Sequence, residues 1–237
     1  MVTKLVSIIL PCYNEAGHLE NSVKTLVEES KKFNFDFEFI FVEDKSTDST
    51  REVLKKIEPE LKNAKFIYHN ENSGRGGAVK TGFAASKGDI VGFIDIDLEV
   101  GPRYIPQFVE ALETNDAAIA NRKYYSDSFL RALIRETLSN YYRSLNKKVL
   151  KHSYSDTEAG YKFFRKESLK GFFETKTNDH WFWDTEFVMY CFHEKLKLTE
   201  IDVEFLRDNT KKSTVNVVKD SFHYLKELRR YKKQLKG

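Results

Sequence analysis

Residues 92–99 read GFIDIDLE, an apolar run that leads directly into three carboxylates spaced two residues apart. Side chains at positions i and i+2 of an extended segment point to the same side. If the strand ends where Asp95 begins, Asp95, Asp97 and Glu99 meet at its carboxyl end. Three acids placed together repel one another unless a cation lies among them, and Mg²⁺ and Mn²⁺ prefer oxygen ligands. The stretch predicts either a divalent-metal site or an acidic strand exit that faces water.

The same pattern, an apolar run followed by polar residues, occurs twice more towards the N-terminus. Residues 5–10 form an apolar run that stops at Pro11, and 35–42 form a second run that stops at a cluster of acids and hydroxyls. Further strands are expected at 66–69 and 90–94, and helical spacing lies between the strands, at 20–32, 49–57 and 78–86. This alternation predicts a doubly wound, mostly parallel α/β sheet. In such sheets ligands bind at the carboxyl ends of the strands, where these polar clusters lie.

The second half of the chain is less regular. We expect a helix at 105–112, a strand at 117–120, a long amphipathic stretch at 129–150 and an apolar helix at 182–192. No repeat or linker interrupts the chain, which predicts one domain over 1–218 followed by a basic amphipathic helix over 219–237. That helix suits two arrangements, in the interface of an anionic membrane or packed on the domain.

Composition limits the function further. Of 237 residues, 41% are apolar and 32% are charged, a balance typical of a globular protein. The net charge of +3 is concentrated in the last nineteen residues, which argues against a nucleic-acid binder. Cys12 and Cys191 form no metal or redox motif and favour a reducing compartment. No stretch approaches the roughly 18 apolar residues of a membrane span, and the start lacks a signal-peptide pattern. We therefore expect a cytoplasmic protein.

Five motifs taken in order resemble family-2 glycosyltransferases of the GT-A fold. They are the segment PCYNE at 11–15, VEDKSTD at 42–48, GRGG at 74–77, DID at 95–97 and Asn121-Arg122. Downstream, DTEAGYK at 156–162 and WDTE at 183–186 are similar to the branch that glycosylates dolichyl or polyprenyl phosphate. The resemblance covers roughly residues 6–224. It implies inverting, metal-dependent transfer of a hexose from UDP-glucose or GDP-mannose, and segment 156–162 slightly favours glucose.

The resemblance also implies roles for individual residues on the donor side. The nucleoside pocket would be made by residues of the first two strand ends: Pro11, Tyr13, Asn14, Glu15, Val42, Asp44 and Ser46. Asp95 and Ile96 would contact the donor, and Asp97, with Asp95 and Glu99 beside it, would hold the metal that bridges the diphosphate. Relatives commonly have an amide at the position of Glu99, so the role of Glu99 as a ligand stays open. Arg207 and Lys211–Thr214 correspond to a loop that closes over the nucleotide.

On the acceptor side, a lipid phosphate is already ionised at neutral pH and needs positioning rather than a base. Arginine suits this task because its planar guanidinium binds phosphate with two hydrogen bonds. Arg122 is the first candidate and Arg131 the second. Asp184 would act as a base only for a hydroxyl acceptor. The glycines at 74–77 either bring amides close to a phosphate or form a plain turn.

We expect a nucleoside diphosphate sugar, a polyprenyl or dolichyl phosphate and the cytoplasmic face of a membrane as partners, without an integral span. A homo-oligomer or a membrane-anchoring partner is compatible with the sequence. Two alternatives remain: transfer to a saccharide or protein hydroxyl, and a non-catalytic nucleotide-sugar-binding subunit of a membrane complex. A nicotinamide dehydrogenase is disfavoured because the first strand is not followed by the GxGxxG fingerprint.

Overall fold

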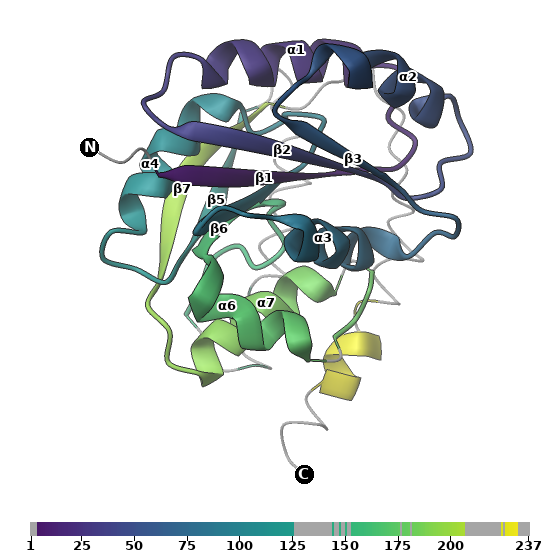
Figure 1. The fold of residues 1–237 in the computed structure, drawn as a ribbon. Helices are drawn as coiled ribbons and strands as arrows, with labels where there is room; N and C mark the ends of the chain where they lie inside the picture. The colour runs from purple at the N-terminus through teal and green to yellow at the C-terminus, as the bar shows by residue number, and fades with distance from the viewer. Residues whose placement is uncertain are drawn as a thin grey trace.

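The computed structural model describes residues 4–125, 144, 147, 150, 153–175, 177–180, 182–206, 224 and 226–231. Its centre is a sheet with strand order β3-β2-β1-β4-β6-β5-β7 (Figure 1). The strands are β1 (Leu5–Cys12), β2 (Asp36–Glu43), β3 (Ala64–Tyr68), β4 (Ile90–Ile94), β5 (Ala117–Tyr125), β6 (Tyr161–Arg165) and β7 (Leu198–Leu206). The helices are α1 (Leu19–Ser30), α2 (Thr50–Ile57), α3 (Gly74–Ala85), α4 (Ile105–Ala111), α6 (Lys166–Glu174) and α7 (Trp183–His193), with short 3₁₀ turns at Glu58–Glu60 and Pro102–Tyr104.

All strand pairs are parallel except those of β6, which runs antiparallel to both β4 and β5. The predicted mostly parallel, doubly wound α/β sheet is therefore confirmed. The parallel pairs bring the carboxyl ends of β1, β2, β3 and β4 to one edge. The loops after these strands consequently lie close together, which positions the candidate site.

Helices cover both faces of the sheet, as Figure 1 shows for α1 and α2 on one side and α3, α6 and α7 on the other. Alternate side chains of β1 follow this division. Ile8 and Leu10 are buried in a core with α1, α2 and α4, whereas Ile9 is buried in a core with α3, α6 and α7. The continuous apolar run of β1 is thus required by burial on both faces.

The sequence-based expectation missed three elements and shortened a fourth. β6, α6 and β7 were not expected, and β5 runs to Tyr125 rather than ending at 120. The cause is tertiary pairing: β5 and β7 pair without interruption from Ala117 with Leu198 to Tyr125 with Leu206. A polar stretch such as NRKYY acquires strand conformation from its neighbour rather than from its own pattern.

The C-terminal helix packs on the domain over its described part, 224 and 226–231. Leu228 is buried with Phe182 and Met189, and Tyr224 and Tyr231 contact the ring of Phe182 at centroid distances of 5.3 and 5.8 Å. The boundary expected at 218/219 and most of the stretch at 129–150 lie outside the described residues. Within the described ranges, no helix combines the length and apolarity that a membrane span needs.

Candidate functional site

The acidic segment lies at the carboxyl end of β4, which ends at Ile94 as the sequence predicted. The loop turns at Leu98, whose φ of 54° lies in the left-handed region and whose amide donates to the carbonyl of Asp95 at 3.1 Å. This turn brings the three carboxylates to one small cavity, lined by Asp95, Asp97, Glu99, Val100, Arg122, Gly160, Tyr161 and Phe205. The cavity combines acidic groups from the β4 loop with a cation from β5.

Asp95 belongs to an ion-pair network that extends behind this cavity. Arg75, in the first turn of α3, lies 2.7 Å from Asp95 and 3.1 Å from Asp184. Asp184 also contacts Lys162 at 2.6 Å. Both cations lie beside the ring of Phe93, at 5.8 Å for Arg75 and 5.4 Å for Lys162. Four charged side chains from α3, β6, α7 and the β4 loop are therefore tied together around one aromatic ring.

Electrostatics at this network favour an additional cation. Loss of hydration by burial, together with the negative charges of Asp97 and Asp184, raises the pKa of Asp95 to about 7, although Arg75 opposes the shift. The side chain of Asp95 is nevertheless 46% exposed, so its carboxylate is open to an incoming ion. Among the described residues of the network and the cavity, together with Asp156 and Glu158 beside Arg122, formal charges are unequal, with three cations against six carboxylates: Arg75, Arg122 and Lys162 against Asp95, Asp97, Glu99, Asp156, Glu158 and Asp184. Hard oxygen donors with excess negative charge fit Mg²⁺ or Mn²⁺.

The described residues contain no ready-made cluster of three metal-ligating side chains. The carboxylate of Asp95 forms an ion pair with Arg75, while Asp97 accepts a hydrogen bond from the amide of Glu99 at 3.3 Å. The set Asp95, Asp97 and Glu99 stays a prediction for the metal. Oxygens from a bound diphosphate would complete its coordination.

On the donor side, Asn14 and Ser46 join the loops after β1 and β2. The side-chain oxygen of Asn14 accepts from the amide of Thr47 at 2.8 Å, and the amide of Asn14 donates to Ser46 Oγ at 3.1 Å. Asn14 has a φ of 59°, which asparagine tolerates better than most residues. The described contacts of both residues are thus between loops, and their expected contact with a nucleotide stays a prediction.

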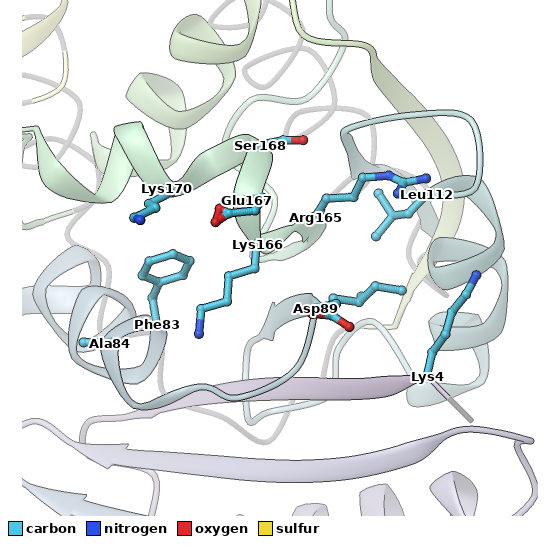
Figure 2. A pocket seen from close by; sticks show the side chains of 11 residues that line it. Lys4, Phe83, Ala84, Asp89, Leu112, Arg165, Lys166, Glu167, Ser168 and Lys170 are labelled. Atoms are coloured by element: carbon cyan, nitrogen blue, oxygen red, sulfur yellow. The ribbon is translucent and has the colours of Figure 1, made fainter. Parts of the chain in front are cut away.

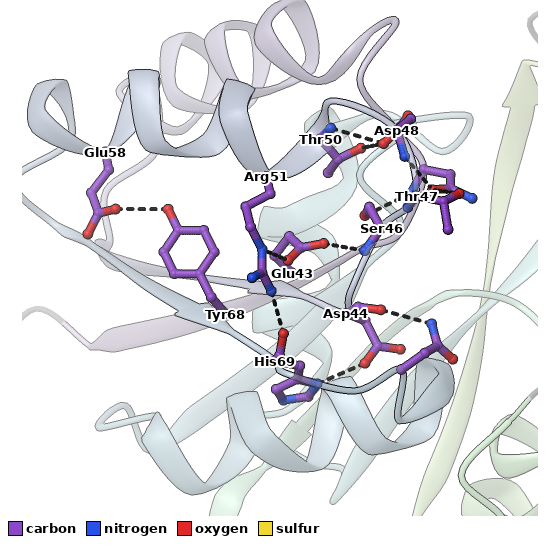
Figure 3. A network of polar contacts seen from close by, with 12 residues as sticks. Glu43, Asp44, Ser46, Thr47, Asp48, Thr50, Arg51, Glu58, Tyr68 and His69 are labelled. Carbon is purple, nitrogen blue, oxygen red and sulfur yellow. Dashed lines mark hydrogen bonds and ion pairs between the residues drawn. The ribbon is translucent and has the colours of Figure 1, made fainter.

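Asp44 is at the centre of a second group of contacts (Figure 3). One of its oxygens lies 2.8 Å from His69 Nδ1, as Figure 3 shows. The same oxygen accepts from both the amide and the hydroxyl of Ser73, each at 2.8 Å. Ser73 precedes the first residue of α3, so Asp44 satisfies a free amide at the start of that helix. The side chain is 2% exposed. A loop-capping role is therefore present in the structure, and a role in base or ribose binding stays a prediction.

Other predicted donor residues differ in how accessible they are. Pro11 pairs with Val42 across β1 and β2, but the Val42 side chain is buried with Ile40 and Ala78 beneath α3. Ile96 is likewise buried in the core. Tyr13, by contrast, is 43% exposed, and Glu15 contacts His18 at 2.7 Å. The side chains of Val42 and Ile96 are therefore closed to a ligand, and the expected donor contacts of these two residues stay predictions.

The glycines at 74–77 are the first turn of α3 rather than a loop before it, so the helix starts earlier than the expected 78. The amides of Gly76 and Gly77 donate to the carbonyl of Asp179 at 2.8 and 3.2 Å. A Cβ atom on Gly76 would lie 2.6 Å from Trp183, which explains the glycine there. These two amides are occupied by the protein itself. Of the two alternatives for residues 74–77, these contacts match the structural one, in which the amides bond to the protein rather than to a phosphate.

Arg122 lies inside β5 rather than after it, because β5 is longer than expected. Its Nε and Nη2 atoms donate to the two oxygens of Asp156 at 2.7 and 3.0 Å, and its side chain is 19% exposed. It lines the same cavity as the acidic segment. Arg131, Arg207 and Lys211–Thr214 lie outside the described residues, so their expected roles stay predictions.

Sequence reasoning missed two members of the charged network, Arg75 and Lys162. Arg75 was passed over because its glycine-rich surroundings indicated a turn. Lys162 stood within the segment 156–162, but a lysine on an unrecognised strand gave no sign that it would be fully buried. The acids Asp95 and Asp184 were identified. These acids need cations near them, and that need was the signal that could have pointed to Arg75 and Lys162.

A cavity larger than the one at the acidic segment lies elsewhere in the described part of the chain. It has a volume of about 820 Å³ and lies at the amino end of β4, opposite to Asp95 (Figure 2). Its lining includes Lys4, Phe83, Asp89, Arg165 and Lys166. Arg165 and Lys166 both donate to backbone carbonyls there, so these cations have structural contacts.

Comparison with known proteins identifies the family. Residues 7–173 match the model described as glycosyl transferase family 2. Glycosyltransferase AglD of Haloferax volcanii is 30% identical over 204 residues, which is 84% of this chain but 33% of that protein. A dolichyl-phosphate beta-glucosyltransferase of Dictyostelium discoideum is 28% identical over 93% of this chain and 75% of its own length. This chain thus spans about a third of AglD, and 44% of a putative glycosyltransferase CsbB from Bacillus subtilis.

Solved structures agree on the fold. Glucosyl-3-phosphoglycerate synthase from Mycobacterium tuberculosis, in complex with Mn²⁺, UDP-glucose and phosphoglyceric acid, superposes with a TM-score of 0.70 at 18% identity. The superposition covers 94% of this chain and 77% of that one. The seven-stranded α/β domain therefore has the GT-A-type fold of glycosyltransferases, and the chain belongs to glycosyl transferase family 2.

Proposed function

We propose that this chain transfers a hexose from a nucleoside diphosphate sugar to a polyprenyl or dolichyl phosphate, with inversion at the anomeric carbon. One observation carries the proposal: Asp95, Asp97 and Glu99 share a cavity with Arg122. Carboxylates suit the divalent ion that accompanies a diphosphate, and arginine suits a second phosphate. A bound metal would neutralise the charge that builds on the departing nucleoside diphosphate.

The residues of this chain then have distinct tasks. Asp97 and its neighbours hold the donor end, while Arg122, fixed by Asp156, orients the acceptor oxygen towards the anomeric carbon. The phosphate oxygen attacks from the face opposite to the leaving group. The anomeric carbon–oxygen bond of the donor breaks, and its electron pair leaves with the nucleoside diphosphate. No proton has to be removed from the acceptor, so no general base is required.

Transfer to a hydroxyl is the second candidate, and the contacts of Asp184 disfavour it. A general base must accept a proton, but Asp184 is 1% exposed and lies against two cations, Arg75 and Lys162. Each of its carboxylate oxygens is paired with one of these cations inside the protein rather than turned towards an acceptor. Asp184→Asn should abolish turnover if the acceptor is a hydroxyl and only weaken it if the acceptor is a phosphate.

We further propose UDP-glucose rather than GDP-mannose as the donor. Relatives named dolichyl-phosphate beta-glucosyltransferase, including one from Saccharomyces cerevisiae that is 25% identical over 94% of this chain, support this choice. Because the proposed acceptor is a lipid, we also propose that the enzyme acts at the cytoplasmic face of a membrane. The exposed cations Lys226, Arg229 and Arg230 of the C-terminal helix are compatible with anionic headgroups.

The proposal is tested by incubating the purified chain with UDP- and GDP-sugars and a short-chain polyprenyl phosphate, with Mg²⁺ or Mn²⁺ and with chelator. A glycolipid product that requires both the lipid phosphate and the metal is expected. Product formed without added lipid phosphate, or at an undiminished rate in chelator, contradicts the mechanism. Binding of UDP-sugars without turnover on any acceptor would favour a non-catalytic subunit instead.

A further inference from the structure

The segment Asp156–Glu158 is held between the cavity and the C-terminal helix. At one end Asp156 binds Arg122 through two hydrogen bonds, and the amide of Glu158 donates back to Asp156 at 3.3 Å. In the middle, the hydroxyl of Thr157 lies 3.2 Å from that of Thr185 on α7. Both Asp156 and Thr157 are buried. This short segment therefore fixes the arginine that faces the acceptor.

Tyr224 of the C-terminal helix closes the other end of this segment. Its hydroxyl lies 3.1 Å from Thr185 Oγ1, and Thr185 Oγ1 lies 3.2 Å from the hydroxyl of Thr157. A phenol and two threonine hydroxyls can each donate one hydrogen bond and accept another, so the three form a continuous chain. One hydroxyl thus joins the C-terminal helix to α7 and to the segment that holds Arg122.

The helix that carries Tyr224 is anchored independently of this hydroxyl. Leu228 is buried against Phe182 and Met189, and Glu227 accepts from the side chain of Asn178 at 3.2 Å. The aromatic ring of Tyr224 itself packs on Phe182. Removal of the hydroxyl alone should therefore leave the helix docked, so that positioning can be separated from folding.

We propose that Tyr224 is a positioning residue for the acceptor: through Thr185 and Thr157 it holds the segment that carries Asp156, and through Asp156 it sets the direction of Arg122. This inference rests on the proposed function, because it assumes that Arg122 meets the lipid phosphate. It assigns to the C-terminal helix a part in forming the site, in addition to any contact with a membrane. Donor binding, at the carboxylates of the β4 loop, does not depend on Tyr224.

The test compares Tyr224→Phe with the wild-type chain and with Lys226→Gln/Arg229→Gln, a control that changes exposed cations of the same helix. Leaving the buried hydroxyl of Thr185 without this partner is worth roughly a tenfold change in an equilibrium. We expect Tyr224→Phe to raise the KM for a detergent-soluble polyprenyl phosphate about tenfold. The Kd for the UDP-sugar with Mn²⁺, measured by calorimetry, should stay within about twofold. The control should keep both constants and lose only affinity for anionic vesicles.

Each outcome has one meaning. An acceptor KM for Tyr224→Phe equal to the wild-type value overturns the inference, as does an equal rise in donor Kd, which would indicate a general structural role. If Tyr224→Phe lowers the melting temperature, restoration of the KM at a lower assay temperature would also assign the effect to folding and overturn the inference. If the wild-type chain makes no glycolipid at all, the proposed function fails rather than the role of Tyr224.

Discussion

The ammonium group of Lys162 lies 2.6 Å from a carboxylate oxygen of Asp184, and both side chains are almost completely buried. Burial lowers the pKa of Lys162, while Asp184 opposes the shift. Neither charge would be stable here alone, since ions lose much of their hydration in the interior. Together with Arg75 they connect β6, α7 and α3 at the back of the candidate site. The pair is a structural condition for the position of Asp95.

Asp184→Asn should therefore destabilise the protein by about 3–5 kcal/mol, because it leaves a buried lysine without its carboxylate. Urea unfolding at pH 7 measures the change. The double variant Asp184→Asn/Lys162→Met should be more stable than Asp184→Asn, since it removes the remaining buried charge. Glu113→Gln is a suitable control: it breaks the exposed pair with Lys4 and should cost no more than about 0.5 kcal/mol. Equal losses for the two single variants would contradict this account of the network.

The sequence predicted the first half of the fold well because that half is made of local patterns. Apolar runs such as residues 5–10 and 90–94 alternate with helical spacing, and the polar residues after each run indicated the strand ends. β7 and the outer part of β5 could not be found in this way. Apart from the buried Val203, the residues of β7 are half-buried or exposed, and the conformation of both strands depends on pairing with each other.

The sequence likewise predicted some residues of the candidate site and missed others. The positions of Asp95, Asp97 and Glu99 follow from the strand-end rule. Arg122 was expected after its strand and lies inside β5, but the structure places it around the same cavity as the three acids. The partners Arg75 and Tyr224 come from segments distant in sequence, and nothing in their local pattern relates them to Asp95 or Glu158. Contacts of this kind depend on tertiary packing, which spacing and composition do not encode.

Gly160→Ala should disrupt the corner where α3 meets the β4 loop. A Cβ atom at position 160 would lie 1.9 Å from an oxygen of Asp95 and 2.0 Å from a nitrogen of Arg75, so the ion pair must move apart. We expect weaker Mn²⁺-dependent UDP binding in calorimetry and a loss of stability typical of overpacking, about 1–3 kcal/mol. Gly17→Ala is the matched control, because nothing lies within 4 Å of the added carbon. Unchanged binding in Gly160→Ala would show that the Arg75–Asp95 pair has no part in the donor site.

Asp97→Asn should remove the dependence of nucleotide binding on the metal. Loss of residues that merely support metal ligands costs about 10–100-fold in affinity, so loss of a direct ligand should cost at least about 100-fold. Calorimetric titration of UDP with and without Mn²⁺ gives the comparison. Glu99→Gln makes the same carboxylate-to-amide change at the second position, and a loss as large as that of Asp97→Asn would make Glu99 a direct ligand as well. If Asp97→Asn binds UDP with wild-type affinity in Mn²⁺, the metal assignment for the β4 loop is wrong.

Glu186 provides a pH-dependent prediction away from the metal candidates. Burial raises the pKa of Glu186 above its usual range, although the amide of Asn178, which donates to it at 2.6 Å, opposes the shift. A raised pKa means that the folded chain binds this proton more tightly than the unfolded chain. The stabilising contribution is therefore fully present below the unfolded pKa of roughly 4.3 and is lost as pH rises through the folded value. Glu186→Gln stays neutral throughout, so its stability relative to the wild type should increase as the pH rises above the unfolded pKa, as urea unfolding at several pH values can measure. The exposed Glu20→Gln should show no such trend. A difference between Glu186→Gln and the wild type that does not change with pH would mean that Glu186 ionises equally easily in the folded and unfolded chains.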